Sequence, residues 1–125
     1  MVNNIEVVQY LLIRKDLNMS NGKMAAQASH CSLASVYLYM DDEYVKEWLS
    51  KAFTKVVLSI SGLNEANKII EVLKNNSIVH AVIQDNCRTE LEPEEDGRTL
   101  TCIGIKPYPK SLVHPLIKRL QLYKD

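Results

Sequence analysis

The chain has 125 residues and carries 15 Lys plus Arg against 15 Asp plus Glu, so its formal net charge is zero. This length predicts one domain, residues 1–125, which buries about two-thirds of its unfolded surface without disulfide support. The balanced charge excludes a general attraction to nucleic acid, so an RNA partner would need a local basic patch.

The cysteines and the apolar runs indicate a cytoplasmic protein. Cys31, Cys87 and Cys102 form no C-x-x-C pair and leave an odd thiol, and the N-terminus lacks the apolar core of a signal peptide. No apolar run approaches the roughly 20 residues that span a bilayer, so we expect no membrane insertion.

The first predicted strand, residues 7–13, is nearly all apolar, as expected for a central strand that is covered on both faces. Cap and turn formers such as Ser20 follow it, and Gly22 then allows a tight approach of the backbone. Lys23 begins a helix. Free N–H groups and the macrodipole make the start of this helix a place to hold an anion beside Lys23.

One face of this helix is polar, because Lys23, Gln27 and His30 stand four and seven residues apart at about 100° per residue. Small residues on the other faces, including Ala25 and Ala28, would let the helix lie close to a sheet. A single histidine on a helix fixes no chemistry, so the residues alone favour a buried His30 that bonds a backbone carbonyl.

The rest of the chain alternates between strand and helix patterns. In chain order we expect a short helix at 41–51, a strand at 54–60, a helix at 63–75, a strand at 78–83, an acidic loop at 90–97, a strand at 99–105 and a helix at 111–123. Strands separated by helices predict a single three-layer α/β domain, with helices on both faces of a mixed sheet.

Two polar segments, residues 16–23 and 85–89, follow the first and third predicted strands. Sites in such folds lie beyond the carboxyl ends of the strands, so we expect both segments to reach one cleft.

Several common sites are excluded. A P-loop would need a hydroxyl where Met24 stands and a glycine where Leu17 stands, and no G-x-G-x-x-G or G-x-S-x-G motif occurs. The three histidines and three cysteines never occur at ligand spacing, so we expect neither a metal nor a cofactor.

The surviving residues suit hydrolysis of an activated ester on a phosphate-rich molecule. Asp85 could orient or deprotonate water, Lys23 could stabilise the oxyanion, and Thr89 or Thr99 could position water or carbonyl. On spacing alone, the favoured interpretation is simpler: Asp85 and Arg88 form a salt bridge within their loop, and Thr99 is an ordinary strand residue.

Motifs along nearly the whole chain resemble the type 2 peptidyl-tRNA hydrolase family of archaea and eukaryotes. The matching residues are D-L-x-M-x-x-G-K-x-A-A-Q-x-x-H at 16–30, Trp48 with K-V-V at 55–57, I-x-D-x-x-R-T at 83–89, Thr99 and L-x-L-Y at 120–123.

This resemblance implies a four-stranded mixed sheet with two helices on each side, and metal-free cleavage of the ester between a peptide and its tRNA. By position it assigns catalysis to Lys23, Asp85, Thr89 and Thr99. The expected partner is peptidyl-tRNA, and a homodimer is plausible. The substrate-binding residues that we expect are Gly22, Gln27, His30 and Arg88, with a basic patch of Arg14, Lys15 and Lys106.

The chain departs from the family pattern near the third strand. Asn86-Cys87 replaces Ala-Gly, Glu90 replaces Gln, and an acidic stretch about two residues longer follows, whose carboxylates would repel RNA phosphates that they faced. The sequence 106–110, Lys-Pro-Tyr-Pro-Lys, replaces Gly-Pro-Gly-Pro, as in a divergent eukaryotic branch. Two alternatives therefore stay open: a tRNA- or protein-binding module with little activity, and hydrolysis of another acylated RNA or nucleotide ester.

Overall fold

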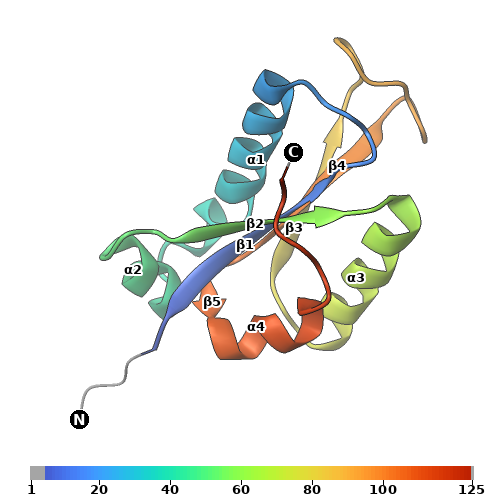
Figure 1. Ribbon diagram of the computed structural model, residues 1–125. Helices are drawn as coiled ribbons and strands as arrows, with labels where there is room; N and C mark the ends of the chain where they lie inside the picture. The colour runs from blue at the N-terminus through green and yellow to red at the C-terminus, as the bar shows by residue number, and fades with distance from the viewer. Residues whose placement is uncertain (1–4, 125) are drawn as a thin grey trace.

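A mixed β-sheet forms the middle layer of the computed structural model, which describes residues 5–124 (Figure 1). Its strands are β1 (Val7–Arg14), β2 (Lys55–Ile60), β3 (His80–Asp85), β4 (Thr99–Ile105) and β5 (Tyr108–Pro109). The order is β2-β1-β4-β3, with β5 paired to the start of β1. β1 and β2 are parallel, and β4 runs antiparallel to both β1 and β3. The predicted α/β class is confirmed, and β5 is a short addition to the four expected strands.

Helices cover both faces of this sheet (Figure 1). The first pair is α1 (Asn21–Ala34) and α2 (Glu43–Leu49), joined by a 3-10 turn at Tyr37–Tyr39. The second pair is α3 (Leu63–Asn75) and α4 (Lys110–Ile117), whose apolar residues form the largest core cluster with the sheet. β1 is buried along its whole length, which explains its almost unbroken apolar sequence.

The face of α1 that packs on the sheet differs from the prediction. Gln27 and Cys31 are buried, whereas Ala25 is exposed. The Gln27 amide can be buried because it donates a hydrogen bond to the Thr101 hydroxyl at 2.7 Å. The close approach comes from Gly104 of β4, where a Cβ would lie 2.3 Å from the Cys31 carbonyl oxygen.

The last predicted helix is too long. α4 ends at Ile117, and the chain beyond it runs along β2. Ser59 N–H donates to the Gln121 carbonyl at 2.9 Å, and Tyr123 N–H donates to the Val57 carbonyl at 3.0 Å. β2 is the outer strand of the sheet, so these bonds satisfy backbone groups that would otherwise have no partner there.

Several other boundaries shift by one or two residues. α1 begins at Asn21 rather than at Lys23, because the Ser20 side chain caps it and accepts from Lys23 N–H at 3.2 Å. β3 begins at His80, two residues later than expected.

Candidate active site

Two chain segments meet at one edge of the sheet, beyond the carboxyl ends of β1 and β3. These two strands are parallel to each other, because each pairs antiparallel with β4. The start of α1 and the loop from β3 to β4, coloured blue and orange, lie at this same end of the molecule (Figure 1). The predicted convergence of residues 16–23 and 85–89 is confirmed.

An ion pair between Lys23 and Asp85 joins these segments. Lys23 Nζ lies 2.6 Å from Asp85 Oδ1, and the two side chains are only 15% and 12% exposed. Lys23 Nζ also donates to Thr89 Oγ1 at 3.3 Å. Asp85 therefore pairs with Lys23, and the expected loop salt bridge with Arg88 is wrong.

The carboxylate of Asp85 is held from two sides. Its second oxygen accepts from Cys87 N–H at 2.8 Å. Burial by itself raises the pKa of Asp85, but the hydrogen bond and charge of Lys23 and the N–H of Cys87 outweigh it, so the pKa lies below its usual value. Asp85 is therefore ionised at neutral pH.

Sequence reasoning missed the role of Cys87. This residue has a left-handed backbone, with φ of 61°. The left-handed turn brings its N–H back to the Asp85 side chain, two residues earlier. The signal that could have revealed it was an Asp at the end of a strand, followed by the turn former Asn86.

The pair lies in a polar cleft of about 350 Å³. Its lining consists of Lys23, Gln27, His30, Ile83, Gln84, Asp85, Asn86, Arg88 and Thr89. His30 and Arg88 are both exposed, so the expectation of a buried His30 is wrong. They add ionisable groups to the outer part of the cleft.

Thr99 is not part of this cleft. It is 1% exposed, its hydroxyl donates to the Glu92 carbonyl, and Cys87 Sγ contacts it at 3.4 Å. The structure therefore brings Lys23, Asp85 and Thr89 together and leaves Thr99 behind them, beneath the acidic loop.

The start of α1 is already occupied by a carboxylate of the chain. Glu90 accepts from Ser20 N–H and from the Ser20 hydroxyl, each at 2.8 Å. The predicted open anion site therefore holds an internal anion. Gly22 lies in the first turn of α1, where a Cβ would meet nothing within 4 Å, so the protein itself does not require a glycine there.

The predicted basic patch is not assembled. Arg14 is 3% exposed and is paired with Asp16 at 2.8 Å and with Glu94 at 2.6 Å. Lys106 is equally buried, lies at the opposite edge of the sheet, and pairs with Asp42 at 2.8 Å above the Tyr108 ring.

Lys15 is the one member of that predicted patch that is exposed at the edge where the cleft lies. It donates to the Lys124 carbonyl and lies 5.7 Å from the centre of the Tyr123 ring.

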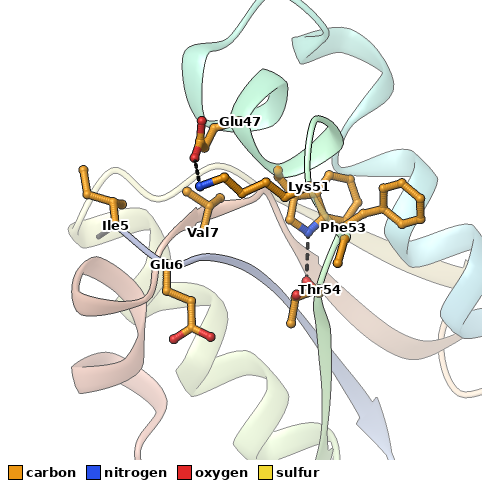
Figure 2. Close-up of a pocket in the computed structure, with 9 residues that line it drawn as sticks. Ile5, Glu6, Val7, Glu47, Lys51, Phe53 and Thr54 are labelled. Carbon is orange, nitrogen blue, oxygen red and sulfur yellow. Dashed lines mark hydrogen bonds and ion pairs between the residues drawn. The ribbon is translucent and has the colours of Figure 1, made fainter. Parts of the chain in front are cut away.

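A second hollow, of about 400 Å³, lies near Val7 and Thr54 at the opposite edge (Figure 2). Two charged residues of this hollow, Glu47 and Lys51, form an ion pair with each other at 2.5 Å. Trp48 Nε1 donates to the Thr54 carbonyl at 2.8 Å, so the indole N–H is used within the fold. The catalytic chemistry is better placed in the cleft of Lys23 and Asp85.

Within residues 5–124 no group of three or more His, Cys, Asp or Glu side chains could hold a metal ion. None of the helices described in that range is long and apolar enough to cross a membrane.

Comparison with known proteins identifies the family. The family model described as "Peptidyl-tRNA hydrolase PTH2" matches residues 7–123. The chain belongs to this family.

Relatives named "Peptidyl-tRNA hydrolase" match nearly their whole length. One from Sulfurisphaera tokodaii is 33% identical over 118 residues, covering 90% of this chain and 94% of the relative. One from Saccharolobus islandicus is 30% identical over 122 residues, covering 93% and 98%. One from Saccharolobus solfataricus is 29% identical over 118 residues, covering 90% and 95%. The PTH2 match includes both segments that form the cleft.

Proposed function

We propose that this chain hydrolyses the ester between peptide and tRNA in peptidyl-tRNA, and that Lys23 and Asp85 carry the reaction. Membership of the PTH2 family and the names of its relatives support the activity. The observation that supports the residues is the 2.6 Å ion pair in a polar cleft, where the two polar segments meet.

The reaction is the attack of water on the ester carbonyl. A C–O bond forms as the attacking water gives up a proton, the bond to the ribose oxygen breaks, and that oxygen takes a proton as the tRNA leaves, so no net proton is gained or lost. The Lys23 ammonium is suited to stabilise the oxyanion of the tetrahedral intermediate. Thr89, within 3.3 Å of Lys23 Nζ, is suited to hold water or carbonyl.

Asp85 is better suited to orient the attacking water than to deprotonate it. A general base works best when its pKa lies near the working pH, and the pKa of Asp85 lies below its usual value. Its carboxylate positions the Lys23 ammonium and can accept a hydrogen bond from the attacking water.

The test is release of tRNA from N-acylated aminoacyl-tRNA. We expect release by the wild type, loss in Lys23→Ala, and retention in Lys74→Ala, which removes an exposed lysine from the last turn of α3. No release by a folded wild type, with tRNA binding retained, would leave a binding module. Absence of binding as well would point to a protein partner.

The binding module remains the second candidate because of the acidic segment, residues 90–96. Glu90 and Glu94 are fixed next to the cleft, where an RNA hydrolase would benefit from cations. Salt dependence separates the candidates, because RNA affinity that rests on Arg and Lys falls steeply as salt rises.

Gln27, Arg88 and His30 line the cleft and keep their proposed role in substrate binding. The resemblance assigns Thr99 to catalysis, but Thr99 lies behind the cleft, and we propose that it supports the loop through Glu92 and Cys87 instead. A homodimer and a cytoplasmic location also stay proposals. Light scattering of the purified protein and fractionation of cells test them.

A further inference from the structure

Every second residue of the acidic segment, from Glu90 to Glu94, makes a hydrogen bond or an ion pair with the body of the domain. Glu90 accepts from Ser20, the Glu92 carbonyl accepts from Thr99, and Glu94 binds Arg14. Leu91 packs between these anchors in the cluster below α1. The segment is therefore held beside the site, and the carboxylates of Glu90 and Glu94 have definite positions.

Glu90 is the carboxylate of this segment whose charge acts on Lys23 and Asp85. Both of its oxygens are bound to Ser20, at the amino end of α1, three residues before Lys23. The N–H and hydroxyl of Ser20 lower the pKa of Glu90, and the charge of Lys23 adds to this, so the carboxylate remains ionised. An RNA phosphate that approached α1 would meet this negative charge.

Two other residues beside the cleft, Arg88 and His30, are exposed and line the same hollow as Lys23 and Asp85. The surroundings of the ion pair thus differ in charge: a carboxylate stands at the amino end of α1, and an arginine and a histidine line the cleft itself.

We propose that Glu90 is a specificity-determining residue, which keeps RNA phosphate away from the amino end of α1 and admits the RNA from the side of Arg88 and His30. This inference rests on the proposed function and adds the direction from which the substrate enters. It also gives the Glu90 departure from the family pattern a role in substrate choice.

The experiment measures the affinity of deacylated tRNA for the wild type, Glu90→Gln and Glu92→Gln. The two variants lose the same charge from the same segment, but only the Glu90 carboxylate bonds Ser20. At about 50 mM salt we expect Glu90→Gln to bind roughly three- to five-fold more tightly, the effect of one screened charge pair, with the gain lost at about 300 mM. Glu92→Gln should change the affinity less than about two-fold.

A second measurement follows the backbone amide signals of the wild type and of Glu90→Gln. On addition of tRNA, the backbone amide signals of Arg88 and His30 should shift, and those of Asn21 and Gly22 should not. In Glu90→Gln the Asn21 and Gly22 signals should shift too. Equal gains in the two variants, or shifts of Asn21 and Gly22 in the wild type, would overturn the inference.

The assay uses deacylated tRNA, so it does not depend on turnover. Hydrolysis by the wild type with unchanged affinity in Glu90→Gln would overturn this inference and leave the proposed function standing. Binding without hydrolysis, with the expected gain in Glu90→Gln, would support the inference on a tRNA-binding module and remove the proposed activity.

Discussion

Arg14, the last residue of β1, forms a two-point ion pair with Glu94, which lies eighty residues later. The distances are 2.6 Å from Nη1 to Oε1 and 3.0 Å from Nη2 to Oε2. Arg14 also donates to the Leu100 carbonyl at 3.0 Å, so this buried guanidinium ties the acidic segment to the end of β1 and the start of β4. The pair is a structural support of the site and leaves Arg14 unavailable to RNA.

Breaking this pair should destabilise the fold. Glu94→Ala leaves the buried guanidinium with Asp16 as its remaining carboxylate partner. We expect the free energy of unfolding to fall by about 1–3 kcal/mol. This is less than the cost of breaking a fully buried pair, because Glu94 is partly exposed. Urea denaturation measures the loss. Glu95→Ala, which removes an exposed neighbouring carboxylate, is the control, and an equal loss in both variants would contradict the role of the pair.

The lowered pKa of Asp85 sets a pH window. The folded-state pKa lies below the unfolded value of about 3.9, so the ionised carboxylate stabilises the fold above that pH, and this stability is lost as the pH falls through the folded-state pKa. We predict that the carboxyl carbon of Asp85 titrates below about pH 3.9 in an NMR experiment. A midpoint above about pH 5 would instead support a general base.

Lys106 should matter for stability and not for turnover. It is buried between Asp42 and the Tyr108 ring, at the edge of the sheet opposite the cleft. Lys106→Ala should lower the free energy of unfolding by about 2–4 kcal/mol, since a buried charge pair and its packing are lost. The turnover of the folded fraction should stay within about two-fold of the wild type. A large fall in the turnover of a fully folded Lys106→Ala variant would contradict this account and support the predicted role of Lys106 in substrate binding.

The sequence predicts most of the fold because its elements carry local patterns. β1 is apolar on both faces, and the helix at 63–75 has its predicted bounds. The position of the site could also be predicted, because β1 and β3 are parallel and their carboxyl ends lie at the same edge of the sheet. Asp85 and Lys23 meet there because each follows one of these strands.

The predictions that were wrong have a common cause: each residue has a partner that lies far away in the chain. In the sequence Arg14 resembles a surface cation, but in the fold Glu94 pairs with it. Residues 118–123 keep a helical spacing, but the open side of β2 binds their backbone instead. Gln27 belongs to the polar face of the predicted helix, yet it is buried, because its amide donates to the Thr101 hydroxyl inside the fold. None of these partners leaves a signal near the residue itself.

The central claim is that Lys23 and Asp85 act as one unit, and a double-variant cycle tests it most directly. Single-turnover hydrolysis of N-acylated aminoacyl-tRNA is measured for the wild type, Lys23→Ala, Asp85→Asn and the double variant, each checked for folding. If the pair works as a unit, each single change lowers the rate on the order of a hundred-fold or more, and the double variant is no slower than about three-fold below the singles. Losses that multiply in the double variant, or a single variant that keeps the wild-type rate, would contradict the account.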